Sequence, residues 1–381
     1  MSVAALQIRL SVLCLASLYG VALAAQSSSG VTRVAQSPSS AEDSAAAKFA
    51  NAQKKAVNRA KESEPFYSAA DPLEIKLTTN IKRIRSDKGD KAPWRPATVS
   101  YRDTAGKTVS IPTLVRTRGI WRLKNCEFPP LRLNFKSEVT KGTLLHGIDK
   151  PKLVSFCQDR DSYEQYIMEE MQLYRIYGLL TPASHRARLL KMTYADSASG
   201  KVQATRMAIL LEEPEVLAAR VGGELVETIG ATPSDLAADQ DVLAAVFQYL
   251  IGNTDWSTYA LHNMELVRKA DGDHMPIPYD FDFSGVINAP YATVDPKLPI
   301  ERVRQRLFRG YCHTPEDFAK VFTLFNEKKP AIYALYKDPI GSRLSKQTVE
   351  ETLKYFDDFY ETINNPRRAK NQIVDACLKI R

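Results

Sequence analysis

Residues 252–285 read GNTDWSTYALHNMELVRKADGDHMPIPYDFDFSG and contain the densest cluster of polar, metal-competent side chains in the chain. Within this stretch, Met264–Val267 is typical of a short strand, and a polar turn at 269–273 leads to a second run that begins at Pro276. A β-hairpin brings its two ends together. We therefore expect the residues just before and just after this hairpin to share one site.

Four residues of this stretch have the chemistry that phosphoryl transfer requires. Mg²⁺ prefers carboxylate and amide oxygens, and a separate carboxylate must orient or deprotonate the attacking hydroxyl. We assign Asp255 as this base and Asn263 and Asp280 as metal ligands. Asp282 is a second possible metal ligand. His262 has no Cys or His partner at metal-ligand spacing and is interpreted as a packing or hydrogen-bonding residue. Taken singly, each Asp is more typical of a turn or a helix cap.

The chain before this stretch is typical of a β-rich region. Apolar and polar residues alternate, as they do in half-buried strands, in residues 73–77, 97–101, 108–111 and 131–135. A further strand at 152–156 is followed by a helix from about Tyr163 to Gly178, and two more strands are expected near 188–192 and 204–211. This order predicts a mostly antiparallel sheet with one inserted helix.

From Glu213 onward the pattern is helical. Helices are expected over residues 234–251, 314–325, 330–336 and 346–363, and Thr314-Pro315 supplies an N-cap and a first-turn proline. The predicted fold class is α+β, a two-lobed protein-kinase-like fold with a β-rich N-lobe that carries one inserted helix and a helical C-lobe. The predicted boundaries are 65–212 for the N-lobe and 213–381 for the C-lobe.

The N-terminus predicts export. Arg9 precedes the apolar run Leu10–Tyr19, and Ala22-Leu-Ala24 places small residues where a signal peptidase accepts them. The run is shorter than the roughly 20 residues of a membrane helix, so a signal peptide over 1–24 is favoured over an uncleaved anchor. A low-complexity linker is expected over 25–64, helical in 45–61. The protein is expected to be secreted, periplasmic or extracellular, with no transmembrane segment after cleavage.

The cysteines and the charge distribution leave alternatives open. After cleavage four cysteines remain (Cys126, Cys157, Cys312 and Cys377), which allows two disulfides in three possible pairings, or four buried thiols. The net charge of +8 is uneven, because residues 26–136 carry 21 Lys and Arg against 10 Asp and Glu. Such an excess suits an anionic partner such as a nucleotide phosphate, a polyanion or a membrane surface, or is a solvated surface.

Several motifs, taken in order, resemble the CotH (spore coat protein H) family of atypical protein kinases over residues 73–363. Arg116-Thr-Arg-Gly119 and the basic strand 129–136 resemble the Arg-Gly loop of that family and the strand after it. Residues 152–178 resemble its strand–helix unit, and 209–212 resemble the strand that leads to its interlobe connection. The segments that resemble those of its active site are 253–255, 262–263 and 278–282.

The resemblance implies transfer of the ATP γ-phosphoryl group to Ser or Thr of a secreted or envelope protein, with Mg²⁺ or Mn²⁺ as cofactor. It implies that Asp255 is the catalytic Asp, Asp280 the metal Asp and Asn263 the second metal ligand. The residues expected to bind the nucleotide are Lys152, with Arg118, Arg132 and Lys136 as competitors for the phosphates, and Glu212. The chain departs from the pattern in two places: Ile120-Trp121 follows the Arg-Gly loop, and Asp255 and Asn263 are eight residues apart, where ordinary kinases have about five.

Two other functions stay open at this point. The first is a non-catalytic, kinase-fold binding or assembly protein of the cell envelope, with the basic N-terminal half as its interaction surface. The second is metal-dependent hydrolysis of a phosphoester, which is less favoured because no second carboxylate cluster is available for a two-metal site. No nucleic-acid partner is expected.

Overall fold

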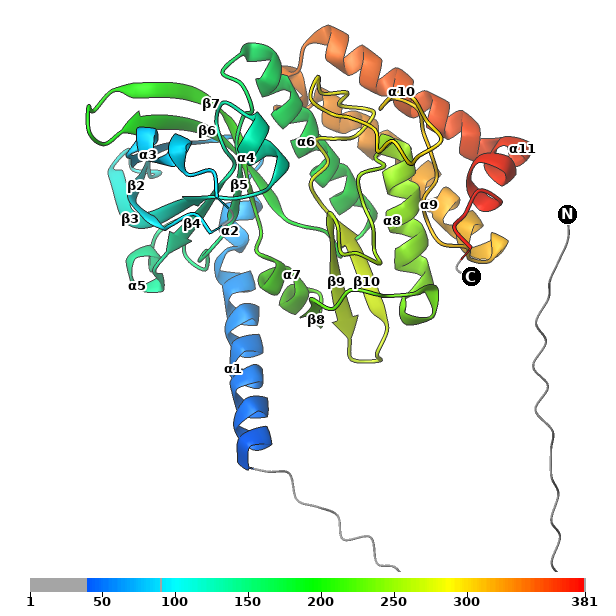
Figure 1. Ribbon diagram of the computed structural model, residues 1–381, viewed down its shortest axis with the longest axis horizontal. Helices are drawn as coiled ribbons and strands as arrows, with labels where there is room; N and C mark the ends of the chain where they lie inside the picture. Colours follow the sequence, from blue (N-terminus) through cyan, green and yellow to red (C-terminus); the bar gives the residue numbers. More distant parts are fainter. Residues whose placement is uncertain (1–39, 90, 380–381) are drawn as a thin grey trace, which may run out of the picture. The chain divides into compact units, whose positions relative to one another are not determined.

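The computed structural model describes residues 40–379 with the exception of residue 90. The chain divides into two units, Met1–Ala47 and Lys48–Arg381, and the account below concerns the second. Helix α1 (Ser40–Glu62) begins in the first unit and confirms the helix predicted over 45–61 (Figure 1). The predicted signal peptide 1–24 and the first part of the predicted linker lie outside the described residues.

Seven strands of the second unit close into a barrel (Figure 1). The strand order is β1-β2-β3-β4-β5-β7-β6, and the barrel closes through a parallel pairing that runs from Leu73↔Leu190 to Thr79↔Asp196. All seven predicted strands are present, and their bounds are β1 (Leu73–Thr79), β2 (Arg95–Arg102), β3 (Thr108–Thr117), β4 (Leu131–Phe135), β5 (Lys152–Val154), β6 (Ala187–Asp196) and β7 (Val202–Leu211).

The predicted two-lobed, protein-kinase-like fold is therefore wrong, because the β-rich region is a closed barrel and not the sheet of a kinase N-lobe. The error has a physical cause. Alternation of apolar and polar residues shows that a segment is a strand with one buried face, but it does not show which strand lies beside it. The parallel pairing of β1 with β6 joins segments more than 100 residues apart and leaves no local signal in the sequence.

The barrel buries side chains on its inner face and, along part of its wall, on its outer face too. The inner face packs fully buried residues such as Leu77, Val115 and Leu153 against one another. The outer face of β5, β6 and β7 carries Val154 and other buried residues that belong to the core of the helical part. Helix α6 (Asp161–Leu180) contacts β6 and β7 there. Lys152 is two residues before Val154, so it also lies on the outer face, towards the helices.

A small three-stranded sheet lies at the lower edge of the helical part (Figure 1). Helix α8 contacts α9, α10 and β10, and α6 contacts α9. The two helices predicted over 314–325 and 330–336 form one continuous helix that contains Pro330. The bounds of the elements are α7 (Pro214–Arg220), β8 (Gly223–Val226), α8 (Ala238–Ile251), β9 (Met264–Lys269), β10 (His274–Pro278), α9 (Pro315–Ala334), α10 (Lys346–Asn364) and α11 (Pro366–Ala369). Short helices are α2 (Glu64–Tyr67), α3 (Ile81–Ser86), α4 (Trp121–Asn125) and α5 (Ser137–Thr140).

All four cysteines of the second unit form disulfides, which decides between the alternatives left open by the sequence. Cys126 is bonded to Cys157 and Cys312 to Cys377. The first disulfide joins the end of α4 to the chain just after β5, and the second joins the segment before α9 to the C-terminal segment. Within residues 40–379, residue 90 aside, no helix has the length and apolar character needed to cross a membrane.

Helix α8 ends at a glycine that the surrounding packing requires. Gly252 has a φ of +65°, and a Cβ placed on it would lie 2.0 Å from the hydroxyl of Tyr355 and 3.4 Å from the Cα of Gly285. Glycine is therefore favoured at position 252 for two reasons: the backbone is left-handed, and Tyr355 and Gly285 leave no room for a side chain. The close approach allows Gly285 N–H to donate to Gly252 O at 3.0 Å, and Val286 N–H to donate to Ile251 O at 3.0 Å.

We predict that Gly252→Ala lowers the free energy of unfolding by about 2–4 kcal/mol, because a left-handed L-residue costs about 1–2 kcal/mol and an overpacked core about 1–3 kcal/mol. Gly222→Ala is the matched control, since Gly222 has a φ of +76° but open space around its Cβ position. This control is expected to lose only about 1–2 kcal/mol. Urea denaturation measures both, and equal losses in the two variants would contradict the packing argument.

Candidate functional site

The β9–β10 hairpin brings the two predicted metal ligands to one end. The last pair of its ladder is Met264↔Pro278, and beyond it Tyr279 N–H donates to Asn263 O at 3.1 Å. Asn263 therefore lies opposite Tyr279, and Asp280 is the next residue along the chain. The expected convergence of the residues on either side of the hairpin is confirmed.

Both of these residues have a left-handed backbone. The φ angles are +52° at Asn263 and +62° at Asp280, and Leu261 has +49°. Left-handed φ is uncommon for residues other than glycine, although Asn and Asp adopt it several times more often than others. Such conformations persist only where the surroundings hold them in place, and they concentrate at functional sites. The conformation of Asp280 is stabilised by a hydrogen bond, in which its backbone N–H donates to the Tyr174 hydroxyl at 2.9 Å.

Asp255 joins the same site from the loop after α8. Asn263 Nδ2 donates to Asp255 O at 2.7 Å and to Asp255 Oδ2 at 3.0 Å, and His262 Nε2 lies 2.8 Å from Asp255 Oδ1. The eight-residue spacing between Asp255 and Asn263 is accommodated by an isolated β-bridge between Ser257 and His262. The interpretation of His262 as a hydrogen-bonding residue is confirmed. The side chain of Asp255 stays 40% exposed, so its carboxylate is open to a substrate.

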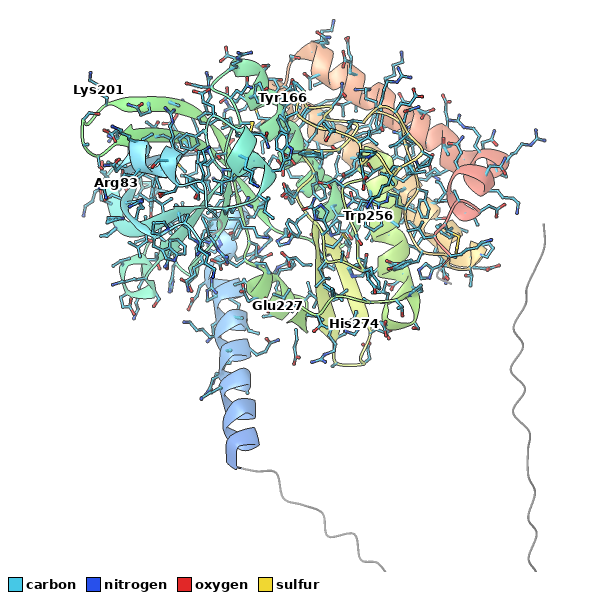
Figure 2. The ribbon with its side chains drawn as sticks, viewed as in Figure 1. Arg83, Tyr166, Lys201, Glu227, Trp256 and His274 are labelled. Atoms are coloured by element: carbon cyan, nitrogen blue, oxygen red, sulfur yellow. A yellow bond between two sulfur atoms is a disulfide. The ribbon has the colours of Figure 1, made fainter. Side chains whose placement is uncertain are left out.

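The base of this loop is fixed by buried contacts. Asn253 Oδ1 accepts from Asp255 N–H at 3.0 Å, and the indole of Trp256 donates to Asn253 O at 3.1 Å. Trp256 is labelled in Figure 2. Arg309 donates to the carbonyls of Thr254 and Trp256. These bonds explain why a loop without regular secondary structure presents Asp255 in one position.

Two basic side chains lie beside Asp280. Lys152 Nζ is 3.2 Å from Glu265 Oε1 and 3.9 Å from the ring centroid of Tyr279. Burial lowers the pKa of Lys152, against the opposing charges of Glu265 and Asp280. Burial also lowers the pKa of Arg118, and the negative charge of Asp280 opposes that shift. The charge of Asp280 therefore affects the pKa of both Lys152 and Arg118, which were predicted to reach phosphates.

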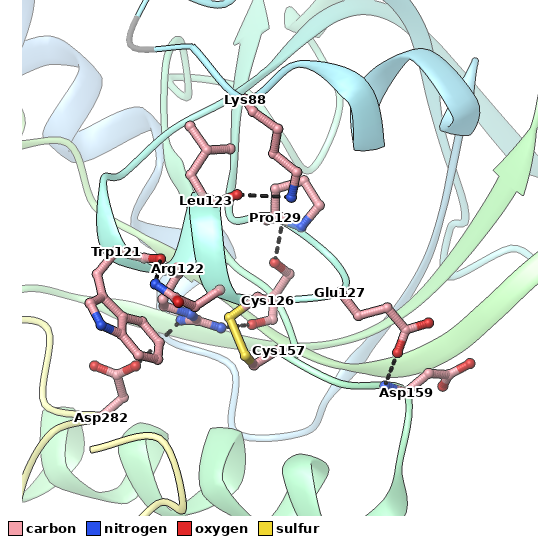
Figure 3. The surroundings of a disulfide bond; sticks show 12 residues. Lys88, Trp121, Arg122, Leu123, Cys126, Glu127, Pro129, Cys157, Asp159 and Asp282 are labelled. Atoms are coloured by element: carbon pink, nitrogen blue, oxygen red, sulfur yellow. Dashed lines mark hydrogen bonds and ion pairs between the residues drawn. A yellow bond between two sulfur atoms is a disulfide. The ribbon is translucent and has the colours of Figure 1, made fainter. Parts of the chain in front are cut away.

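Asp282 lies in a more buried place than the other predicted ligands. Its side chain contacts Arg122, whose Nη1 is 3.8 Å from Asp282 Oδ2 (Figure 3). Burial and the negative charge of Asp280 raise the pKa of Asp282 to about 7, although the positive charge of Arg122 opposes the shift. Glu170 of α6 is fully buried nearby, and burial together with the charges of Asp282 and Asp280 raises its pKa well above the usual range.

Glu265, Tyr279, Glu170 and Arg122 are site residues that sequence reasoning missed. Glu265 was visible as a polar residue in a short strand, between two buried apolar neighbours. Glu170 stands in the run Glu169-Glu170 of an amphipathic helix, where an acidic residue is normally solvated. Its burial depends on what α6 packs against, which the sequence does not show.

Two predicted nucleotide-binding side chains are engaged elsewhere. The carboxylate of Glu212 is buried and forms ion pairs with Arg186 and Arg220. Arg132 donates from Nε to Lys150 O. A third candidate, Lys136, lines a hollow of about 930 Å³ between α1 and the β4–α5 segment, and that hollow contains none of the residues gathered around Asp280. Of the proposed phosphate-binding residues, Lys152 and Arg118 are the two whose pKa is affected by the charge of Asp280, and Arg118 Nε donates to Leu131 O at 3.3 Å.

The donor set fits a hydrated divalent cation. Because Asn263 gives its amide N–H₂ to Asp255, its Oδ1 is free to act as a ligand, and no described side chain hydrogen-bonds to the carboxylate of Asp280. Mg²⁺ typically binds one or two protein oxygens and takes the rest from water and substrate phosphates. Within residues 40–379, with residue 90 left aside, no group of three His, Cys, Asp or Glu side chains is placed to hold a metal ion.

We predict that the pKa of His262 lies above its ordinary value of about 6.5 and falls in Asp255→Asn. The hydrogen bond to Asp255 is the main cause of the upward shift, and burial opposes it. At pH 7 a larger fraction of His262 is therefore protonated in the wild-type chain than in the variant. NMR titration of the imidazole measures this. Asp271→Asn, on the exposed hairpin turn, is the control, and an unchanged His262 pKa in Asp255→Asn would contradict the pairing.

No protein-family model matches the chain, and no curated protein matches it at a significant level. The resemblance to the CotH family stays a prediction that depends on the order of the motifs in the sequence. What the structure adds is independent of that resemblance. Asp255, Asn263 and Asp280 meet at one end of a hairpin, with Lys152 and Arg118 beside them.

Proposed function

We propose that this chain is an exported phosphotransferase of the CotH kind, which transfers the γ-phosphoryl group of ATP to a Ser or Thr hydroxyl of a secreted or envelope protein. The observation that carries the proposal is the meeting of Asp255, Asn263 and Asp280 at the open end of the β9–β10 hairpin. Action outside the cytoplasm is supported by the two disulfides, which persist in oxidising compartments. The closed barrel does not count against it, because chemistry is decided by the site and not by the fold.

Each residue has a role that its contacts support. Asp255 is exposed and is oriented by Asn263 and His262, so it can orient the acceptor hydroxyl and accept its proton. Asn263 Oδ1 and the Asp280 carboxylate would hold Mg²⁺ or Mn²⁺. The cation, when bound, offsets charge on the β- and γ-phosphate oxygens. Lys152 and Arg118 place two positive charges next to that position, where phosphate oxygens would lie.

The ion pair between Lys152 and Glu265 suits this assignment. Glu265 is in β9, one residue beyond Met264, so the hairpin that carries the metal ligands also orients the lysine. The ring of Tyr279, the residue before Asp280, lies under the ammonium group. A lysine held by a carboxylate and an aromatic face loses little side-chain freedom when it binds a phosphate.

We predict that ATP and Mg²⁺ together raise the melting temperature of the purified chain by several degrees, and more than either does alone. A ligand at 100 times its Kd stabilises the folded state by about 2.7 kcal/mol. Asp280→Asn should lose the Mg²⁺-dependent part of the shift. Asp271→Asn, the same substitution on the exposed hairpin turn, should keep it.

The same preparation is tested for transfer of radiolabelled phosphate from ATP to itself and to a casein-like acceptor. Asp255→Asn should retain the thermal shift and lose about 10²-fold or more in transfer rate, as expected for a general base. Absence of both shift and transfer in the wild-type chain rejects the proposal. A shift without transfer would instead favour a non-catalytic nucleotide-binding protein.

A further inference from the structure

Two acidic side chains behind the candidate site are buried without the partners that buried charges require. Glu170 is 0% exposed and Asp282 is 4% exposed. Among the described residues, no hydrogen bond of normal geometry reaches either carboxyl oxygen of Glu170 or the Oδ2 of Asp282. Removing a carboxylate from water costs several kcal/mol unless opposite charge or hydrogen bonds compensate. Burial accordingly raises the pKa of both groups, most strongly that of Glu170, and the ionised form of Asp282 depends on the positive charge nearest to it.

Arg122 supplies that charge. It is only 9% exposed, its Nη1 lies 3.8 Å from Asp282 Oδ2, and its Nη2 donates to Ser155 O. Figure 3 shows the guanidinium group extending from α4 towards Asp282. Arg122 is also the cation that opposes the negative charge acting on Glu170. One arginine thus lies against Asp282 and also lowers the pKa of Glu170.

The position of Arg122 is fixed by a disulfide and by backbone bonds. Cys126, four residues after Arg122, is bonded to Cys157. Glu127 N–H donates to Cys157 O at 2.9 Å, and Ser155 Oγ donates to Pro129 O at 2.9 Å. Residues 155–157 directly follow β5, the strand that carries Lys152. The disulfide therefore joins α4 to the same part of the barrel wall that presents the predicted phosphate-binding lysine.

We propose that Arg122, anchored by the Cys126–Cys157 disulfide, is the positioning residue that holds the 280–282 segment of the candidate site in its observed conformation. Arg122 attracts Asp282 and offsets the charge of the Glu170–Asp282 pair. Asp282 is two residues after Asp280, so fixing its side chain limits the backbone conformations open to Asp280. The consequence for nucleotide binding rests on the proposed function, whereas the conformational claim does not.

Hydrogen exchange of residues 279–287, followed by mass spectrometry, tests the conformational claim. In Arg122→Met the exchange of this segment should become at least tenfold faster, because the buried Asp282 carboxylate loses the positive charge that lies against it. Adding Asp282→Asn should restore most of the protection, because it removes the carboxylate that has lost its partner. Arg188→Met is the matched control, since Arg188 in β6 is 6% exposed and donates to the carbonyls of Phe66 in α2 and of Ala69, which are not part of this segment.

The disulfide is tested in the same assay. Replacing Cys126 and Cys157 together by Ala should accelerate exchange of 279–287, and replacing Cys312 and Cys377 together should not. If Arg122→Met does not fold, Arg122→Lys takes its place and should show a smaller acceleration in the same segment. Unchanged protection in the Arg122 variant, or no rescue by Asp282→Asn, overturns the proposal.

The second readout is the Kd for ATP with and without Mg²⁺. Arg122→Met should weaken binding at least tenfold in the presence of Mg²⁺ and leave Mg²⁺-free binding unchanged, which a general loss of stability would not do. Equal weakening under both conditions counts against a positioning role. If the wild-type chain binds no ATP, only the proposed function fails, and the exchange measurements still decide the role of Arg122.

Discussion

The close approach of the backbone at Gly252 and Gly285 is the constraint on which the candidate site depends. Hydrogen bonds from Gly285 and Val286 to the last turn of α8 join the loop that carries Asp255 to the segment that carries Asp280 and Asp282. A Cβ at Gly285 would meet Val303 O at 2.5 Å, and one at Gly252 would meet Tyr355. Because neither position has room for a side chain, the two segments can pack together only with glycine at both positions. This packing determines where the acidic residues of the two segments lie.

The site combines an open side and a closed side. Asp255, Asn263 and Asp280 are partly exposed. A hydrogen bond joins the side chains of Asn263 and Asp255, and the backbone N–H of Asp280 donates to the hydroxyl of Tyr174 on α6. Glu170, Asp282 and Arg122 lie behind them and are buried. Buried ionic groups contribute little to stability, and in some proteins they define a single arrangement instead. In this chain the buried groups lie next to the 280–282 segment, and the candidate site requires that segment to keep a single conformation.

How much of the site could be predicted depends on how far apart its residues are in the sequence. Asn263 and Asp280 were predictable partners because a single hairpin joins them, and its strands and turn are local patterns. Glu170 and Arg122 were not, because they come from α6 and α4, more than 90 residues before Asn263, and each looks like an ordinary charged surface residue. Glu212 illustrates the reverse error, since a residue at the expected place in the sequence has its carboxylate bound to two arginines.

The sequence by itself determined the strands, most of the helices and the group of polar residues around the hairpin, because these depend on local periodicity and turn chemistry. It also limited the cysteines to a few arrangements. Only the tertiary structure decided that the strands close into a barrel, which cysteines pair and which carboxylates are buried. The physical reason is that pairing and burial depend on contacts between distant segments, and a residue type carries no record of its distant neighbours.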